Sequence, residues 1–174
     1  MKKDPTIERI LKENNLGIKL DIGCGANKQP GFVGMDMRPE PNVDIVHDLE
    51  TFPWPLPDEC VSFATASHVL EHINPYKFVF VNLMNEIWRV LKPHAKFAFV
   101  VPYAGSPGYW QDPTHVNPIT EVTLAYFDPL DQSGLYRIYR PKPWKIIPET
   151  LSMNIHGFLE VVLEKRLEDP SYNQ

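Results

Sequence analysis

The sequence predicts an α/β domain of three layers, in which helices cover a mostly parallel sheet. Five short apolar segments, each bounded by turn residues, have the length and composition of buried parallel strands. A long helical pattern separates the fourth segment from the fifth, as a crossover between parallel strands requires. Residues 157–166, "GFLEVVLEKR", alternate apolar and polar side chains in the manner of a half-buried antiparallel strand. Parallel strands first and antiparallel strands last indicate one domain over residues 1–174.

The elements follow one another in a simple order. Residues 5–14 place Ile7, Ile10 and Leu11 at helical spacing, which predicts a short amphipathic helix that covers the core. The predicted parallel strands come next, at residues 18–22, 32–36, 43–46, 61–65 and 97–101. Residues 144–153 and 157–166 are expected to form the antiparallel pair.

Two helices are expected between or after these strands. Asn74 can cap the first helix, Pro75 suits its first turn and Pro93 ends it. Its apolar face consists of Phe78, Met84, Ile87, Trp88 and Leu91, and both Phe78 and Trp88 are expected in the core. A second helix is predicted over residues 118–127, capped by Asn117.

The connections between the first four strands are too short or too rich in proline for crossover helices. Only residues 23–31 join the first two strands, and residues 37–42 join the next two. The prolines of "LETFPWPLPDE", residues 49–59, exclude a regular helix from the third connection. One face of the sheet should therefore be thinly covered. We expect Phe52, Trp54 and Leu56 to pack over it, or a second subunit to do so.

Composition and charge limit the classes of function. The chain of 174 residues and 20.0 kDa is 43% hydrophobic, which suits a packed globular protein. Its net charge of −5 makes a general nucleic-acid-binding role unlikely on electrostatic grounds. No apolar segment approaches the ~20 residues that cross a bilayer, so no membrane association is expected. Two cysteines provide no disulfide framework, and the start of the chain lacks the apolar core of a secretion signal, so a cytoplasmic location is expected.

The segment "LDIGCGANKQPGFVGMDMRP" is the most informative about ligands. Gly23 and Gly25 follow a buried strand, where the absence of side chains lets a ligand approach the backbone. Asp21 lies in that strand, and Asp36 ends the next strand, where a carboxylate can bind both hydroxyls of a ribose. Because no helix N-terminus follows to bind a pyrophosphate, the ligand should be a nucleoside without a phosphate chain.

At this point the sequence resembles the class I S-adenosylmethionine (SAM)-dependent methyltransferases, in a short form like their type 11. The resemblance covers residues 18–101 and rests on an ordered set of segments: "LDIGCG", "VGMDM", "VHDLETFPW", "ASHVLEHI" and "EIWRVLKPHAKFAFVVP". It implies a Rossmann-like three-layer sandwich with strand order 3-2-1-4-5-7-6 and, here, reduced helices on one face. It also implies SAM as the cofactor.

The same resemblance implies the cofactor-binding residues. Asp21, Gly23 and Gly25 would hold the methionine end of SAM, and Asp36 would bind its ribose. Asp48 would accept a hydrogen bond from the adenine amino group, and Leu49 and Met37 would flank the adenine ring. Ser67 and His68 would line the pocket beside the sulfonium.

Two departures from the family pattern qualify what the resemblance implies. "ANKQPGF" stands where the family has a helix, although shortened members carry a similar loop. The N/D-P-P-Y motif of amino-group methylation on nucleobases is absent after the fourth strand, where residues 65–68 read Thr-Ala-Ser-His.

The segment "SHVLEHI", residues 67–73, also matches the inverted zinc-peptidase signature H-x-x-E-H. That signature needs a continuous helix, and Pro75 disfavours helical geometry at Asn74 directly after the motif. We therefore expect no metal site. For Glu71 and His72 a structural contact at the start of a helix is the favoured interpretation, whereas His68 is equally compatible with a structural role and with lining the pocket.

Methyl transfer from a sulfonium mainly requires that donor and acceptor be aligned, and a base only if the acceptor loses a proton. The candidate catalytic residues are Asp112 and His115, which follow the fifth strand on the crevice side, together with His68. Tyr103, Tyr109 and Trp110 could form an apolar wall. Asp112 and His115 are equally compatible with a turn cap and a loop hydrogen bond.

The sequence thus favours a SAM-dependent methyltransferase that acts on a small molecule or on an exposed group of a larger acceptor. The alternative is a non-catalytic, degenerate SAM-binding interaction module, which the missing helices would suit. The acceptor is not indicated by the sequence. A homodimer through the thinly covered sheet face is the expected assembly.

Overall fold

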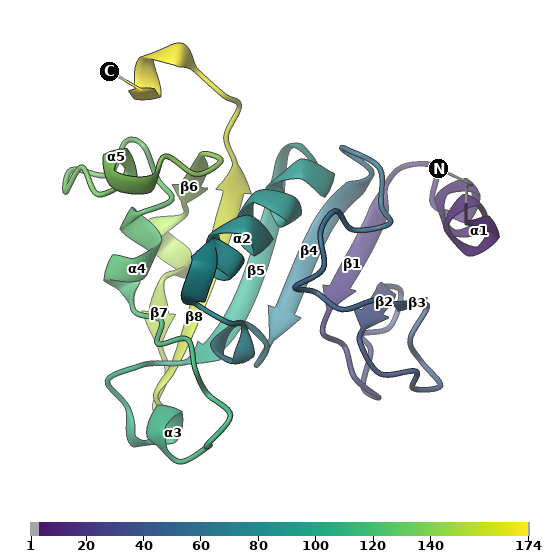
Figure 1. The fold of residues 1–174 in the computed structure, drawn as a ribbon, viewed down its shortest axis with the longest axis horizontal. Coiled ribbons are helices and arrows are strands. Elements are labelled where there is room, and N and C mark those ends of the chain that lie inside the picture. The colour runs from purple at the N-terminus through teal and green to yellow at the C-terminus, as the bar shows by residue number, and fades with distance from the viewer. Residues whose placement is uncertain (1–3, 174) are drawn as a thin grey trace.

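The computed structural model describes residues 4–173, which form a central sheet with helices beside it (Figure 1). The strands are β1 (Ile18–Ile22), β2 (Val33–Asp36), β3 (Ile45–Val46), β4 (Val61–Ser67), β5 (Leu91–Pro102), β6 (Trp144–Ile146), β7 (Ser152–Met153) and β8 (Phe158–Lys165). The α-helices are α1 (Pro5–Glu13), α2 (Val79–Val90), α3 (Pro107–Trp110), α4 (Glu121–Ala125) and α5 (Tyr136–Tyr139). Short 3₁₀ helices are η1 (Leu70–His72), η2 (Tyr76–Phe78), η3 (Pro148–Thr150) and η4 (Pro170–Asn173).

The strands pair in the order β3-β2-β1-β4-β5-β8-β6, and β7 also pairs with β8. The first five strands are parallel, whereas β6, β7 and β8 pair in antiparallel fashion. Apart from the short β7, this is the predicted order 3-2-1-4-5-7-6. The predicted Rossmann-like fold class, with a mixed sheet, is confirmed.

The core lies between the sheet and α2, which crosses in front of β4 and β5 in Figure 1. Strands β5 and β8 contribute the pairs Phe97–Leu163 and Phe99–Val161 to one face, and all four side chains are buried. Ile87 of α2 is fully buried against this cluster. The alternation of residues 159, 161 and 163 predicted this face correctly.

Helix α2 starts later than predicted. The Asn74 side chain accepts a hydrogen bond from the Tyr76 N–H, so it closes a local turn at the start of η2 and does not cap an α-helix. Lys77 and Phe78 then have positive φ angles of 51° and 61°, and the α-helix begins only at Val79. Phe78 consequently points outward with 55% of its surface exposed, so the prediction that it belongs to the core was wrong.

The second predicted helix is shorter than residues 118–127. Helix α4 begins after Thr120, whose side chain pairs with that of Thr123 in a capping box. The predicted cap, Asn117, has a different role, because its side-chain amide donates to the carbonyl of Leu70. Pairing of a buried amide with the backbone of a distant turn is a tertiary effect that local capping signals do not report.

The three connections predicted to lack helices are loops, as expected. Trp54 and Leu56 from the third connection are buried, with 2% and 3% of their surfaces exposed, and Phe52 is half-buried against the same core. The backbone of this loop is fixed to α2, since the Trp54 N–H donates to Glu86 and the Leu56 carbonyl accepts from Arg89.

The opposite face of the sheet is less covered. One row across it consists of Lys19, Phe63, Lys96 and Glu164, which are neighbours in the strand register. Both lysines are exposed, and Phe63 and Glu164 are only partly buried. The thin cover predicted for one sheet face is therefore present, although charged side chains interrupt its apolar surface.

Replacing Asp4 with alanine is expected to destabilise the protein by about 1 kcal/mol, because its carboxylate caps α1 by accepting from the Thr6 N–H at 2.8 Å. Urea denaturation measures this difference. Asp4→Asn is the matched control, since asparagine caps about as well. An equal loss in both variants would contradict the capping role.

Candidate functional site

The candidate site begins at the glycine turn after β1. Gly23 has φ +66°, and its N–H donates to the Met35 carbonyl of β2 at 2.8 Å. A side chain at Gly23 would overlap the methyl groups of Val69, which follows β4. Only glycine fits here, because the turn requires a left-handed backbone and a close approach of two strand ends.

The loop that replaces the first crossover helix is held by side chains. The Gln29 N–H donates to Asp21 at 2.8 Å, and the Lys28 ammonium group lies 2.7 Å from an Asp44 carboxylate oxygen. That same oxygen accepts from the Gly34 N–H of β2. The loop is thus ordered by two carboxylates, Asp21 near the carboxyl end of β1 and Asp44 just before β3, and it forms a wall without a helix.

This loop encloses a cavity of about 320 Å³. The lining residues are Asp21, Gly23, Cys24, Asn27, Gln29 and Ser67. Three of them, Asp21, Gly23 and Ser67, are among the residues predicted for the cofactor. The cavity lies where the carboxyl ends of β1 and β4 meet, the usual place for a ligand in an open α/β sheet.

Two ionisable groups in this cavity have shifted pKa values. Burial raises the pKa of Asp21, which is only 5% exposed, while the hydrogen bond from Gln29 opposes the shift. Burial, reinforced by the negative charges of Asp21 and Asp36, raises the pKa of the Cys24 thiol to about 11. The cavity therefore holds a neutral thiol beside two carboxyl groups from adjacent strands.

Asp36 lies beside the cavity and not in its wall. One of its carboxylate oxygens accepts from the Gly25 N–H at 2.9 Å, and the other accepts from the Arg38 N–H. Gly25 has φ +50°, so the carboxylate and the glycine turn position each other. Because a carboxylate has about four acceptor sites, Asp36 can still accept from the two hydroxyls of a ribose.

The residues predicted for adenine lie at the next strand end. Asp48 is exposed, and its carboxylate accepts from the Glu50 N–H. Met37 is 63% exposed, whereas Leu49 is buried with its carbonyl accepting from the Trp54 indole. None of these three lines the cavity, but all follow β2 or β3, at the edge of the sheet that carries Asp21 and Asp36.

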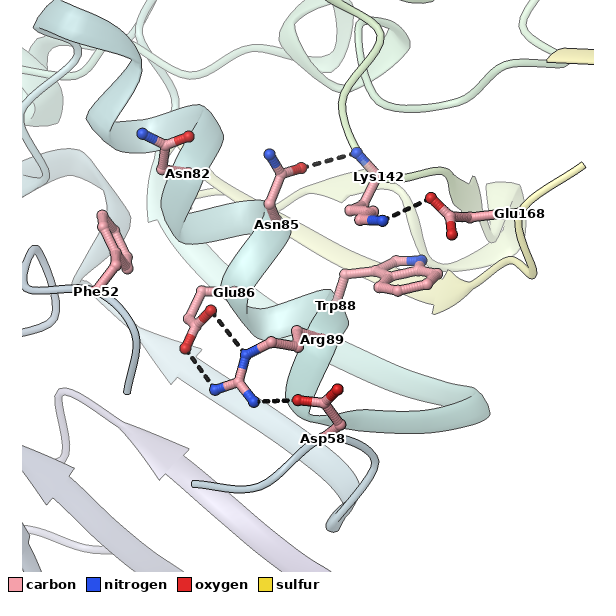
Figure 2. Close-up of a pocket in the computed structure, with 9 residues that line it drawn as sticks. All are labelled: Phe52, Asp58, Asn82, Asn85, Glu86, Trp88, Arg89, Lys142 and Glu168. Atoms are coloured by element: carbon pink, nitrogen blue, oxygen red, sulfur yellow. Dashed lines mark hydrogen bonds and ion pairs between the residues drawn. The ribbon is translucent and has the colours of Figure 1, made fainter. Parts of the chain in front are cut away.

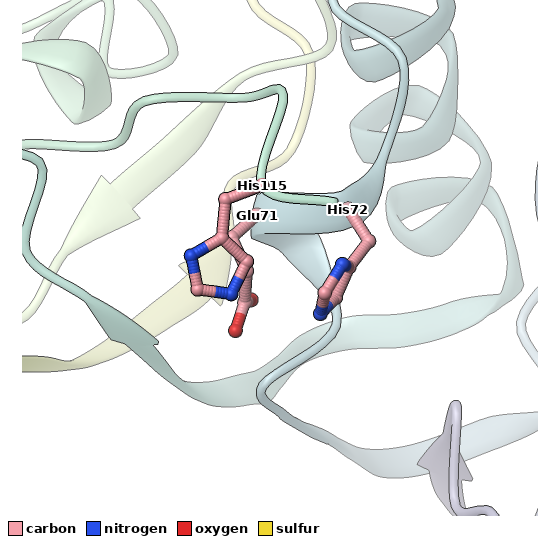
Figure 3. A group of neighbouring side chains, drawn as sticks. All are labelled: Glu71, His72 and His115. Carbon is pink, nitrogen blue, oxygen red and sulfur yellow. The ribbon is translucent and has the colours of Figure 1, made fainter. Parts of the chain in front are cut away.

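A second cluster lies next to the cavity, on η1 and on the loop that follows β5 (Figure 3). Glu71, His72 and His115 bring one possible ligand atom each to within 4.8 Å of one another. Glu71 is fully buried, and among residues 4–173 neither of its carboxylate oxygens has a hydrogen-bond partner. Burial raises the pKa of this carboxyl group to about 7.

His68 connects the cavity to this cluster. It follows Ser67, which lines the cavity, and its φ of 55° turns the chain sharply out of β4. Its Nδ1 lies 3.4 Å from a Glu71 oxygen, without the alignment of a hydrogen bond. Burial, with smaller contributions from the positive charges of His115 and His72, lowers the pKa of His68, so the imidazole is neutral at pH 7.

Asp112 and His115 are neighbours, with 3.9 Å between an Asp112 oxygen and His115 Nε2. Asp112 accepts from both the hydroxyl and the N–H of Thr114, and these hydrogen bonds lower its pKa. A carboxylate with a lowered pKa is a weaker base, which favours a positioning role for Asp112. Tyr109 is buried beside the His115 ring, whereas Trp110 is 74% exposed.

A larger hollow of about 590 Å³ lies along the outer side of α2 (Figure 2). Its charged groups pair with one another: Arg89 with Glu86 and Asp58, and Lys142 with Glu168. Arg89 and Asp58 lie where α2 ends and β4 begins, opposite the carboxyl ends of the strands. We assign this hollow to the packing of the third connection and not to ligand binding.

Sequence reasoning missed several residues of the site. Cys24, Asn27 and Gln29 line the cavity, and the "GCGANKQPG" segment in which they occur was the available signal. Glu71 and His72 were assigned to structure, because nothing in the local sequence shows that His115 returns to meet them.

Comparisons with known proteins agree with the fold. The family model described as a methyltransferase domain matches residues 20–99. The fold is similar to a SAM-dependent methyltransferase of Archaeoglobus fulgidus, with 18% identity, a TM-score of 0.59 and 91% of each chain covered. It is also similar to SAM-dependent methyltransferases of Aquifex aeolicus (19% identity, TM-score 0.54, 94% of each chain) and Mesorhizobium loti (16% identity, TM-score 0.53, 91% of this chain and 97% of that one).

Two further comparisons gave negative findings. No curated protein matched the chain significantly. Among the described residues, 4–173, no helix has both the length and the apolar character that a membrane crossing needs.

The cofactor that the resemblance implies fits the residues present, since the buried carboxyl group of Asp21, the Gly23 turn and Ser67 line one cavity at the carboxyl ends of β1 and β4. The resemblance stated from the sequence is confirmed at this level: residues 20–99 match a methyltransferase-domain model, and the strand order is the one that the resemblance implied. The similar structures are SAM-dependent methyltransferases, which implies S-adenosylmethionine as the cofactor.

Proposed function

We propose that this protein is a SAM-dependent methyltransferase that acts on a small molecule or on an exposed group of a larger acceptor. The observation that carries the proposal is the cavity at the carboxyl ends of β1 and β4, with Asp21 in its wall and Asp36 hydrogen-bonded to its glycine turn. Two carboxylates and a bare backbone turn suit a ligand with an amino group and a ribose.

Different residues would contact the different parts of the cofactor. Asp21 and the backbone at Gly23 and Gly25 would hold the methionine end, and Asp36 would accept from the ribose hydroxyls. Asp48 would accept from the adenine amino group, with Met37 and Leu49 beside the ring. Ser67 and His68 would lie near the sulfonium, because they continue from the cavity wall toward the second cluster.

When bound, SAM supplies an electrophilic methyl group, and the protein aligns an acceptor with it. Neutral His68 can accept a proton from an acceptor that must lose one. Asp112 and His115 would position the acceptor from the loop after β5, with Tyr109 as part of an apolar wall. The position of these residues beside the cavity supports a role for them in catalysis.

Calorimetry with SAM and with S-adenosylhomocysteine (SAH) tests the cofactor assignment. We expect micromolar binding of both. If neither ligand binds, the proposal is wrong. If both bind but no acceptor is methylated, and if His115→Ala and Asp112→Ala change only stability, the chain is instead a non-catalytic SAM-binding module.

Alkylation of the cysteines provides an independent measure of where the cofactor binds. A pKa near 11 in place of 9.0 leaves about a hundredfold less thiolate at pH 8, so Cys24 should react slowly with iodoacetamide and accelerate as the pH rises. SAH should slow Cys24 further, since this residue lines the cavity.

Cys60 is the internal control for this experiment. Its pKa is also about 11, but it lies outside the cavity, so SAH should leave its rate unchanged. Mass spectrometry separates the two rates. Equal protection of both cysteines would indicate a global change in stability and not a ligand at Cys24.

We also propose that the thinly covered sheet face pairs with a second copy of the chain. Partly buried Phe63 and the opposite charges of Lys96 and Glu164 on that face support the proposal. Light scattering coupled to gel filtration should give twice the chain mass, and a mass of one chain at tens of micromolar would contradict it. The cytoplasmic location stays a prediction.

A further inference from the structure

The carboxylate of Glu71, which is buried and has no hydrogen bond among residues 4–173, is the starting point for a second site, and His68 Nδ1 lies 3.4 Å from one of its oxygens. Its side chain is 1% exposed, and both oxygens lack a hydrogen-bond partner among residues 4–173. Buried carboxylates are normally hydrogen-bonded, ion-paired or bound to a metal ion. Figure 3 shows this carboxylate directed to the same space as the rings of His72 and His115.

The two histidine rings are oriented by the backbone. The carbonyl oxygen of Tyr109 lies 2.7 Å from His115 Nδ1, and the carbonyl oxygen of Thr114 lies 3.2 Å from His72 Nδ1. A carbonyl oxygen only accepts hydrogen bonds, so Nδ1 of each neutral ring carries the proton and Nε2 carries a lone pair. Metal-binding histidines are held in the same way, with one ring nitrogen hydrogen-bonded to a carbonyl oxygen and the other nitrogen directed to the metal ion.

We propose that Glu71, His72 and His115 bind a divalent transition-metal ion, with His68 and Asp112 at its border. The ligand atoms lie within 4.8 Å of one another. Neighbouring ligand atoms of a tetrahedral Zn²⁺ ion are about 3.4 Å apart, from bond lengths of about 2.0–2.2 Å, so side-chain rotations that bring the atoms roughly 1 Å closer together complete the site. Two imidazoles and one carboxylate suit Zn²⁺, Mn²⁺ or Fe²⁺ better than Mg²⁺.

Three protein ligands leave coordination positions open, as in catalytic metal sites. The cluster lies near the cofactor cavity, because Ser67 lines that cavity and His68, the next residue, lies 3.4 Å from Glu71. The metal site would therefore hold the acceptor through a hydroxyl oxygen. This assignment of acceptor class rests on the proposed function, whereas metal binding itself does not.

The proposed reaction is the transfer of a methyl group from SAM to the hydroxyl oxygen of the acceptor. Coordination lowers the pKa of the acceptor hydroxyl, whose O–H bond breaks and whose proton passes to His68 or water. An oxygen lone pair forms the new bond to the methyl carbon, and the electron pair of the C–S bond returns to sulfur. The products are a methyl ether, SAH and one proton.

Metal titration of the SAM-free protein tests the site directly. Zn²⁺, Mn²⁺ and Mg²⁺ are titrated separately by calorimetry, and we expect one Zn²⁺ or Mn²⁺ per chain, at least tenfold tighter than Mg²⁺. The bound metal should raise the melting temperature. Stoichiometric binding of none of the three would overturn the proposal.

Three variants separate a metal ligand from a structural residue. Glu71→Gln should remove metal binding while raising the melting temperature of the metal-free protein, because it removes a buried carboxylate that has no hydrogen bond among residues 4–173. His72→Asn should also remove binding, whereas the same change at the exposed His94 should leave it intact. Unchanged metal affinity in Glu71→Gln would show that the carboxylate is not a ligand.

The acceptor class is tested with acetohydroxamate, an oxygen-donor ligand, added to the Co²⁺-substituted protein. A change in the visible Co²⁺ spectrum is expected if coordination positions are open, and an unchanged spectrum would contradict acceptor binding at the metal. A parallel SAH titration keeps the proposals apart. SAH binding without metal binding rejects only the metal site, and metal binding without SAH binding rejects only the proposed function.

Discussion

Replacing Arg89 with leucine is expected to lower the free energy of unfolding by about 3–5 kcal/mol, because it leaves the carboxylate of Glu86 buried without its partner. The Arg89 guanidinium donates to both oxygens of Glu86, at 2.6 and 2.9 Å. Its hydrogen bonds with Glu86, followed by those with Asp58, raise the pKa of Arg89 further above its ordinary value. Figure 2 shows this group of charges on α2.

The loss extends to the loop that replaces a crossover helix. Arg89 also donates to the Leu56 carbonyl at 2.9 Å, and Glu86 accepts from the Trp54 N–H. Residues 54 and 56 cover the core, so detaching this loop would expose two large buried side chains. The part of the fold in which loops replace crossover helices therefore depends for its stability on one ion pair, which fixes a loop to α2.

Urea denaturation of the variant measures the effect. Arg9→Leu is the matched control, because Arg9 forms an exposed pair with Glu13 on α1 and should change stability by less than about 0.5 kcal/mol. The double variant Arg89→Leu/Glu86→Gln should recover part of the loss, since the buried charge is gone but an acceptor for Trp54 remains. No recovery would argue that the guanidinium contacts to the loop carbonyls dominate.

Asp36→Ala should weaken SAH binding by at least about a hundredfold. Two hydrogen bonds from ribose hydroxyls to a carboxylate contribute about 1.5–3 kcal/mol each, and about 3 kcal/mol corresponds to roughly a hundredfold in affinity. The variant also removes the acceptor of the Gly25 N–H, which positions the turn beside the cavity. Asp36→Asn keeps one acceptor oxygen and should lose about tenfold.

Asp131→Ala is the control for backbone effects. Asp131 accepts from the N–H two residues later, as Asp36 does, but it lies on the loop after α4 and makes no hydrogen bond with the glycine turn. It should leave the affinity for SAH unchanged in calorimetry. If Asp36→Ala also binds SAH with unchanged affinity and remains folded, the assignment of the ribose to Asp36 is wrong.

Local signals predicted most of the framework. The strand at residues 18–22 has the predicted bounds, because its apolar run and the glycine turn that ends it are both local. The absence of helices from three connections followed from their length and prolines, which act through backbone geometry alone. The glycine turn with Asp21 and Asp36 followed from the rule that parallel strands expose their carboxyl ends at one edge.

The exact ends of the helices and strands depended on tertiary contacts, which local sequence signals do not contain. Strand β5 begins at Leu91, earlier than the predicted start at residue 97, because Leu91 pairs with Val61 of β4 before a shift in register and Lys96 pairs with Phe63 after it. Asn74 and Asn117 have the side chains of helix caps, but one closes a local turn at the start of η2 and the other donates to the backbone of η1. An amide can satisfy either role, and the neighbouring chain selects between them.

By itself, the sequence was sufficient for the parallel strands, the loops in place of helices and the carboxylates beside the glycine turn, because periodicity, proline and glycine act on the nearby backbone. The sheet order came from the resemblance to a known family. The second cluster required the folded chain. His115 reaches Glu71 and His72 only because the loop after β5 crosses η1, where the backbone of Val116 and Asn117 donates to the Glu71 carbonyl. Burial of a carboxylate and the orientation of two imidazole rings are properties of that crossing, and no spacing within either segment encodes them.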